Sequence, residues 1–203
     1  MKEFWDNRYA ETEFAYGTEA NKFLKEELIK IPKGKILFPA DGEGRNSVFA
    51  ATLGWEVTSF DISHEGQKKA LQLARNKQVK IEYLVEDLEK IGFKNDQFDV
   101  IALIFAHFPS NIKSHYHQLL STYLKKGGKV IFEAFSKKHI DYNTKNEKVG
   151  GPKDIDTLFS KEEIVNDFKE FEIIELSEKE VELNEGKYHI GKGSVIRFVG
   201  KKI

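Results

Sequence analysis

The chain has 203 residues, 40% hydrophobic and 32% charged, a composition that excludes a disordered or fibrous protein and favours one globular domain. The 32 Lys and Arg nearly balance the 33 Asp and Glu, which argues against a protein that works by gripping nucleic acid. The absence of Cys excludes disulfides, thiolate zinc sites and cysteine nucleophiles.

No apolar run reaches the ~18–20 residues needed to span a bilayer, and the first residues lack the apolar stretch of a signal peptide. We therefore expect a soluble, cytoplasmic protein without a membrane or nucleic-acid partner. We expect it to be a monomer or a weak homodimer.

The first predicted element is a helix from Thr18 to Ile31, with Thr18 as its N-cap and Pro32 as its stop. Strands and helices then alternate. Strands are predicted over residues 35–38, 56–60, 79–85, 98–105 and 130–135, and helices follow the first, second and fourth of these. Residues 137–158 have no strong period, and Ser160 caps a short helix.

The alternation ends near the C-terminus, where strands over residues 171–176 and 195–199 have no helix between them. Alternating strands and helices indicate an α/β, Rossmann-like sheet with helices on both faces. We predict seven strands, mostly parallel, with one antiparallel strand from the C-terminal hairpin. The chain is expected to be a single domain over 1–203, with residues 1–31 as an N-terminal arm and helix acting as a lid and 34–203 as the catalytic core.

Ligands of such sheets bind at the carboxyl ends of the strands. Here the first strand ends in a turn with Gly42 and Gly44, which let the backbone approach a ligand closely, and a helix N-terminus follows. The second strand ends at Asp61, near the offset at which dinucleotide folds place an acid for the ribose hydroxyls. The third ends with Asp87 and Leu88, an acid and an apolar side chain suited to adenine. Together these strand ends predict an adenosine site.

This pattern resembles the class I S-adenosylmethionine-dependent methyltransferases over nearly the whole chain. The segment Phe38-Pro39-Ala40-Asp41-Gly42-Glu43-Gly44 corresponds to the family's D-x-G-x-G-x-G turn, with Phe38 in place of the acid and Ala40 in place of the first glycine. The run Gly44-Arg45-Asn46-Ser47, followed by Gly54-Trp55-Glu56-Val57, looks most like the tellurite-resistance methyltransferases. Thiopurine methyltransferases are more distant kin.

The resemblance implies S-adenosylmethionine as cofactor and a small-molecule methyl acceptor. It assigns the methionyl moiety to Gly42 and Gly44, the ribose to Asp61, and the adenine to Asp87 with Leu88. Phe105 would lie beneath the donor. Ala40, Asn46 and Ile62 are also expected to line the cofactor site.

Two histidines are candidates for catalysis. His107 follows the fourth strand at the cofactor edge, although it equally suits a role in loop packing. His189 opens the last strand, where the hairpin turns at the same edge, and the tellurite-resistance relatives carry a His there. An imidazole with a pKa near 6.5 can orient or deprotonate a thiol at neutral pH. Ile190 stands where those relatives have Arg.

The aromatic arm supplies lid candidates in Trp5, Tyr9 and Tyr16, whose faces suit a sulfonium, and Tyr142 is a candidate for closing the other side. No metal site is predicted. Two other functions remain open: a non-catalytic protein that binds S-adenosylmethionine or another nucleotide, and an NAD-dependent oxidoreductase. The oxidoreductase would need further parallel strands or a substrate domain after the fifth strand.

Overall fold

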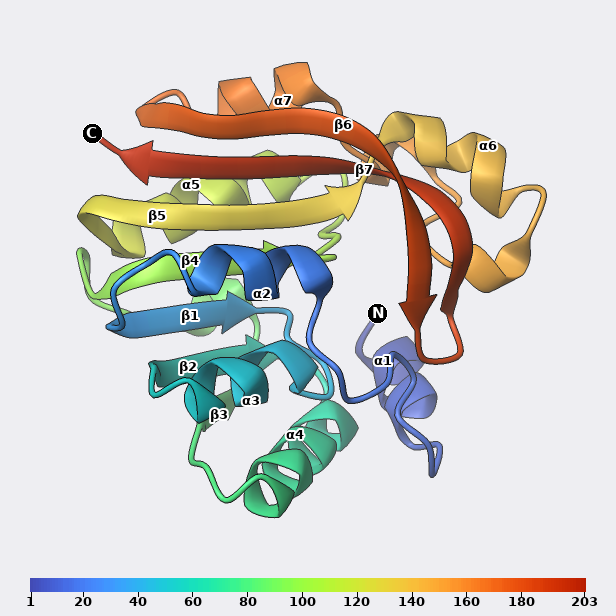
Figure 1. The fold of residues 1–203 in the computed structure, drawn as a ribbon, viewed down its shortest axis with the longest axis horizontal. Coiled ribbons are helices and arrows are strands. Elements are labelled where there is room, and N and C mark those ends of the chain that lie inside the picture. The colour runs from blue at the N-terminus through green and yellow to red at the C-terminus, as the bar shows by residue number, and fades with distance from the viewer.

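A computed structural model describes residues 1–203. One sheet has the strand order β3-β2-β1-β4-β5-β7-β6 (Figure 1). The strands are β1 (Lys35–Pro39), β2 (Glu56–Asp61), β3 (Glu82–Val85), β4 (Phe98–Ile104), β5 (Leu124–Phe135), β6 (Phe171–Glu185) and β7 (His189–Lys202). Strands β1 to β5 pair in parallel, and β7 lies antiparallel between β5 and β6. The predicted Rossmann-like class is confirmed.

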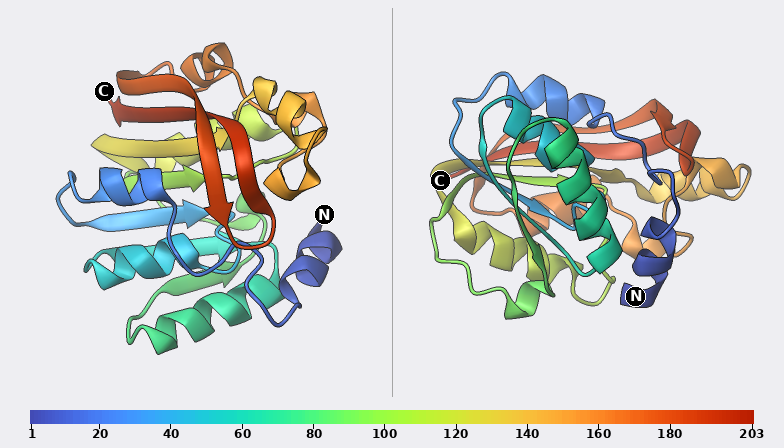
Figure 2. Two further views of the ribbon diagram at one scale, coloured as in Figure 1. Left: turned by 45° about the vertical axis from the view of Figure 1, so that its right-hand side comes forward. Right: turned by 90° about the horizontal axis from the view of Figure 1, so that it is seen from below.

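Helices lie on both faces of this sheet (Figure 2). They are α1 (Lys2–Tyr9), α2 (Lys22–Leu28), α3 (Arg45–Thr52), α4 (His64–Asn76), α5 (Lys113–Tyr123), α6 (Ile140–Asn143) and α7 (Lys161–Asp167). Ser63 and Ser160 cap α4 and α7, as the sequence predicts. None of these helices combines the length and apolar character required to cross a membrane.

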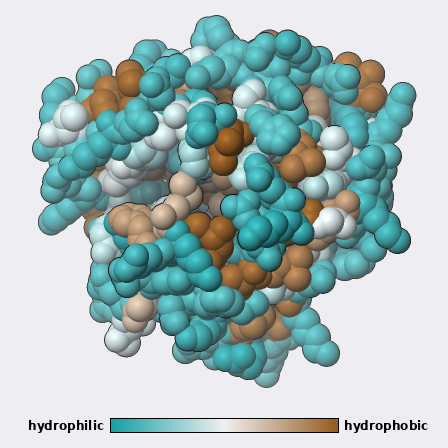
Figure 3. Space-filling view, turned by 180° about the vertical axis from the view of Figure 1, so that it is seen from behind, coloured by the Kyte–Doolittle hydropathy of each residue, from teal (hydrophilic) through white to brown (hydrophobic).

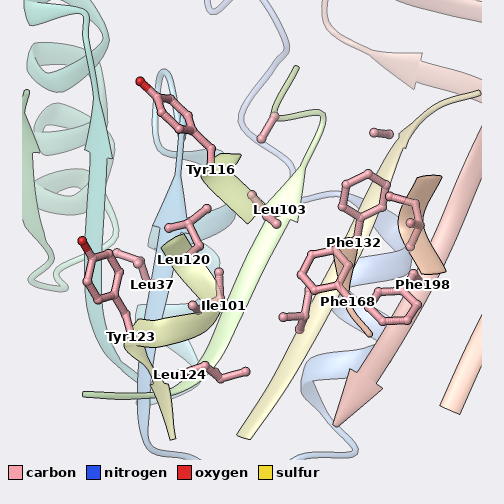
Figure 4. Packing of buried hydrophobic residues seen from close by; sticks show 14 of the residues in the cluster. Leu37, Ile101, Leu103, Tyr116, Leu120, Tyr123, Leu124, Phe132, Phe168 and Phe198 are labelled. Carbon is pink, nitrogen blue, oxygen red and sulfur yellow. The ribbon is translucent and has the colours of Figure 1, made fainter. Parts of the chain in front are cut away.

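The strand pleat sends alternate side chains into two hydrophobic cores. In β1, Ile36 and Phe38 face the core beneath α2 and α3, whereas Leu37 faces the core beneath α5 and α7. In the second core Phe132, Phe168 and Phe198 come together from β5, α7 and β7 (Figure 4). Both faces of the central strands are therefore covered, which holds their carboxyl ends in a fixed row.

The predicted helix over residues 18–31 is wrong at its start. The helix begins at Lys22, because the Asn21 side chain, rather than Thr18, accepts the hydrogen bond of a first-turn N–H, that of Leu24, at 3.0 Å. Thr18 lies in an irregular stretch that connects α1 to α2. Asn21 is therefore buried, and it contacts Glu133 in β5.

The C-terminal hairpin is much longer than predicted. Strands β6 and β7 pair from Phe171 with Lys202 to Glu185 with His189, and the hairpin bends toward α1 beyond the rest of the sheet (Figures 1 and 2). Its outer half is polar, with cross-strand ion pairs such as Lys192 to Glu180 at 3.1 Å. An apolar period shows such a half poorly, because charged residues alternate there with few buried side chains such as Leu183.

Two strand starts and one connecting segment also differ from the prediction. β3 begins at Glu82 rather than Val79, and β5 begins at Leu124 rather than Val130. The segment over residues 137–158 contains α6 and short 3₁₀ turns, and it packs on the hairpin through Val149 and Leu158. The surface seen from behind is mostly hydrophilic, with small apolar groups (Figure 3).

Candidate active site

A cavity of about 950 Å³ lies where β1, β2, β3 and β4 end. The N-terminal arm (residues 1–17), the hairpin tip (residues 185–189) and residues 150–153 complete its walls. This is the edge at which ligands of parallel sheets bind, and the volume falls at the upper end of small-molecule pockets. The walls come from both ends of the chain, so the cavity forms only when the N-terminal arm and the C-terminal hairpin pack against the sheet.

The turn after β1 uses small residues for different purposes. Ala40 and Gly42 line the cavity and have φ angles of 51° and 59°, in the left-handed region. Gly44, at φ 81°, does not line it: a Cβ there would lie 2.5 Å from the Cβ of Ala70 in α4. The implied contact of Gly44 with the methionyl moiety is therefore replaced by a packing role, since only hydrogen lets α3 and α4 approach this closely.

Asp61 lies at the cavity edge with its carboxylate oriented by backbone donors. Its Oδ2 accepts the Gly42 N–H at 2.9 Å, and its Oδ1 accepts the Ser63 N–H at 3.0 Å. Burial raises the pKa of Asp61 to about 6, against the lowering effect of these N–H donors. Each oxygen keeps a second lone pair, so the carboxylate can still accept hydrogen bonds from a ligand.

The end of β3 supplies the next acid. Asp87 accepts a hydrogen bond from the Tyr116 hydroxyl on Oδ1 at 2.9 Å, while its Oδ2 has no protein donor. Leu88 borders the cavity but is buried among core residues. Ile62 and Asn46 line the cavity too. The strand-end residues other than Gly44 are thus brought together.

The N-terminal arm covers the cavity through its aromatic side chains. Trp5, Tyr9 and Tyr16 all line it, and the rings of Trp5 and Tyr9 stack at 5.4 Å. The Tyr9 hydroxyl lies over the glycine turn, 2.6 Å from where a Cβ of Gly42 would be. The arm thus lies where the sequence places a lid.

The hairpin tip holds the arm in this place. The Lys187 N–H donates to the Ala15 carbonyl at 2.8 Å, and the Lys187 ammonium pairs with Glu11 and Glu13. Gly186 packs directly on the arm, so that a Cβ there would overlap the Ala15 carbonyl oxygen. Two segments from opposite ends of the chain therefore form one cover over the cavity.

His189 lies at the base of that cover, with one nitrogen bound and one free. Its Nδ1 lies 3.0 Å from Glu185 Oε2, and the same carboxylate oxygen pairs with Arg45 at 2.8 Å. Nε2 has no protein partner, and the ring lines the cavity. Burial lowers the pKa of His189, while Glu185 acts to raise it. Although burial opposes it, Arg45 and His189 hold the pKa of Glu185 at about 2.

An aromatic wall surrounds the His189 ring. Its centroid lies 4.6 Å from that of Tyr16, 4.7 Å from Phe105 and 5.2 Å from Phe135. Phe105 has a left-handed φ of 53° directly after β4. Three aromatic rings thus surround the imidazole, and its Nε2 has no protein partner and can contact a ligand.

His107 is placed differently, because both of its nitrogens meet the backbone. Nε2 accepts the Phe135 N–H at 3.3 Å, and Nδ1 lies 3.1 Å from the Thr157 carbonyl. Burial lowers the pKa of His107 to about 3. The ring therefore links the loop after β4 to the segment before α7, and a ligand that used its nitrogens would have to displace a backbone group.

Tyr142 does not line the cavity, contrary to the prediction that it closes the site. Its hydroxyl donates to Glu180 at 2.8 Å on the hairpin surface. The same segment instead reaches the cavity through Gly150 and Gly151. Tyr142 therefore takes part in a polar contact with the hairpin surface rather than in the cavity wall.

Sequence reasoning missed a buried polar network behind His189. Asn21 donates to Glu133 at 2.6 Å and to Glu185 at 3.3 Å, and Arg197 donates to Glu133 at 2.5 Å. The i,i+4 spacing of Glu185 and His189 was a visible signal, but the partners of Glu133 lie more than sixty residues away. The network anchors the hairpin to the sheet beside the cavity.

Comparison with known proteins gives a family match over part of the chain. Residues 36–128, from β1 to the turn before the main part of β5, match the family model described as a methyltransferase domain. No curated protein sequence matches.

Solved structures share the whole fold. A structure described under conversion of a disulfide bond into a thioacetal group during echinomycin biosynthesis has a TM-score of 0.78 at 14% identity, covering 100% of this chain and 92% of the other. An S-adenosylmethionine-dependent methyltransferase from Methanosarcina mazei has a TM-score of 0.72 at 19% sequence identity, and the match covers 91% of this chain and 99% of the other. TehB from Haemophilus influenzae has a TM-score of 0.71 at 18% sequence identity, and the match covers 100% of this chain and 67% of the other.

Proposed function

We propose that this chain, an S-adenosylmethionine-dependent methyltransferase, transfers the methyl group to a small acceptor with a thiol, tellurite, selenite or similar nucleophile. The observation that carries the proposal is the covered cavity, with His189 Nε2 free in an aromatic wall. The proposed kinship to the tellurite-resistance group rests on the Gly44-to-Ser47 run and on His189.

The residues at the strand ends fit the cofactor. Asp61 has free lone pairs for two ribose hydroxyls, and Asp87 Oδ2 lacks a protein donor and can accept from an adenine amino group. Ala40 and Gly42 leave room for the methionyl part beside the turn. When bound, the cofactor would supply a methyl group activated by its sulfonium: the acceptor bonds to the methyl carbon as the S–CH3 bond breaks, and S-adenosylhomocysteine leaves as the neutral thioether.

The protein's contribution is orientation, exclusion of water and one proton acceptor. Glu185 accepts a hydrogen bond from Nδ1–H of His189, which fixes the tautomer with a lone pair on Nε2. That nitrogen is placed to take the acceptor's proton as the new bond to carbon forms. Because burial keeps His189 neutral at pH 7, it is ready to act as a base.

The cover supports a small acceptor over a macromolecule. The arm and the hairpin tip meet beside the cavity through Gly186 and Lys187, and this cover over the site favours a small acceptor. The antiparallel β7 also differs from the additional parallel strands that the oxidoreductase alternative requires.

The direct test is formation of S-adenosylhomocysteine from S-adenosylmethionine with a panel of thiols, tellurite, selenite and small amines. We expect turnover with a thiol or a chalcogen oxyanion and little with amines. Asp61→Asn serves as the control with impaired cofactor binding. Tight binding of S-adenosylhomocysteine without turnover on any acceptor in the panel would instead support the non-catalytic alternative.

A further inference from the structure

Of the cationic side chains that line the cavity, only Arg8 is both shielded from solvent and without an acidic partner. Arg45 is paired with Glu185, while Lys90 and Lys153 pair with surface glutamates and, like Lys2, are exposed. Arg8 is half-buried in the arm, lines the cavity, and has no carboxylate within ion-pair distance. A partly desolvated guanidinium without a counter-charge is costly unless a ligand supplies the charge.

The contacts of Arg8 orient it without neutralising it. Its NH1 donates to the Tyr16 hydroxyl at 3.2 Å, and its guanidinium carbon lies 4.0 Å from the Tyr188 ring centroid and 4.9 Å from that of Phe4. Only one of the five N–H donors of the guanidinium is used. The others remain available in the fork that binds carboxylates and oxyanions.

Arg8 belongs to the same wall as His189. Tyr16 links them, because its hydroxyl accepts from Arg8 while its ring packs 4.6 Å from the His189 ring. Tyr188, under the guanidinium, directly precedes His189 in the hairpin tip. A ligand that contacts Nε2 of His189 therefore lies within reach of a cation one aromatic side chain away.

We infer that Arg8 binds an anionic group, a carboxylate or an oxyanion, and that this group belongs to the methyl acceptor. The inference rests on the proposed function and narrows its substrate class to small anionic nucleophiles. The methionyl carboxylate of the cofactor has the same chemistry. Contact with Tyr16, whose ring packs on His189, and with Tyr188, which precedes His189, favours the acceptor as its source.

The test compares two thiols of similar size, anionic 3-mercaptopropionate and neutral 2-mercaptoethanol. Calorimetry with the protein saturated with S-adenosylhomocysteine measures binding of each, and steady-state assays measure kcat/KM. We expect the anionic thiol to be preferred about 10- to 100-fold, the range of a charge-assisted hydrogen bond. Arg8→Gln should abolish this preference, and Arg8→Lys should keep part of it. Arg75→Gln, on the exposed end of α4, is the matched control and should change nothing.

The outcomes separate this inference from the proposed function. Turnover of both thiols without a preference, or a preference that survives Arg8→Gln, overturns the inference alone. Selective binding without any turnover supports the anion site and counts against the proposed function. If Arg8→Gln weakens S-adenosylhomocysteine but not 5′-methylthioadenosine, which lacks the carboxylate, the assignment to the acceptor is wrong and the anion is the cofactor's.

Discussion

Gly186 and Ala15 are packed so tightly that the hairpin tip leaves no room for a side chain beneath the arm. The two residues lie near opposite ends of the chain, yet their contact joins the arm to the hairpin tip, and both segments border the cavity where β1 to β4 end. The cover is therefore held by one steric match as well as by the ion pairs of Lys187.

This match predicts that Gly186→Ala displaces the arm without unfolding the sheet. Cofactor affinity should fall about tenfold, because the arm would no longer exclude water from the site. Calorimetry with S-adenosylhomocysteine and the rate of proteolysis within residues 1–17 give the readouts. Gly127→Ala is the control, since Gly127 has a similar φ of 77° but open space around it. Equal behaviour of the two variants would mean that backbone strain, not the arm contact, matters.

Asp61→Asn should weaken S-adenosylhomocysteine binding by ~1.5–3 kcal/mol, the range for a hydrogen bond to a charged group. The Asp61 carboxyl has a raised pKa of about 6, so it is charged at pH 8 and becomes neutral as the pH falls to 5. Affinity of the unmodified protein should therefore fall toward that of the variant over this interval. Calorimetry at both pH values tests this, and a constant gap between the two proteins would contradict it.

His189→Ala should lower turnover ~10²–10⁴-fold, as expected for a lost acid–base group, with cofactor affinity nearly unchanged. Affinity should hold because the strand ends that fit adenosine do not contact His189. Parallel kcat and calorimetry measurements separate the two effects. A proportional loss of cofactor binding would assign His189 to the scaffold.

Glu185→Gln tests how His189 is tuned. The Glu185 carboxylate raises the His189 pKa against burial, so its removal should lower that pKa further. A base must be neutral to act, so the acid limb of the kcat/KM profile should move to lower pH even though the maximal rate is reduced. An unmoved limb would mean that His189 does not control the profile.

The buried carboxyl group of Asp41 should make the folded state less stable as the pH rises. Burial raises its pKa from the ordinary value of 3.8 to about 7, against the lowering effect of the nearby Ser47 and Ser59, neither of which reaches full hydrogen-bond geometry with the carboxylate. The folded state therefore loses stability as the pH rises from about 4 to about 7. Asp41→Asn should stabilise the protein by about 1–3 kcal/mol at pH 8 and by little at pH 4. Urea unfolding at both pH values measures this, and an equal gain at both would contradict the assignment.

Much of the fold follows from local patterns in the sequence. The apolar runs around Leu37 and Ile101, and the caps at Ser63 and Ser160, depend on residues a few positions apart, so the period of the chain predicts them. The row of strand ends from Gly42 to Asp87 was equally predictable, because parallel strands must end at one edge. The same local logic brings the residues predicted to bind adenosine to one side of the cavity.

The proposed acceptor side of the site depends on tertiary structure. Arg8 and the Glu185–His189 pair meet through Tyr16 only after a charged hairpin bends over the arm, and no periodicity encodes that path. Gly44 resembles a ligand-binding glycine in sequence, yet in space it accommodates Ala70. His107 resembles a catalytic residue, yet two backbone groups take its nitrogens. Hydrogen bonds and steric contacts between distant segments depend on positions to within an ångström, which only the packed chain determines.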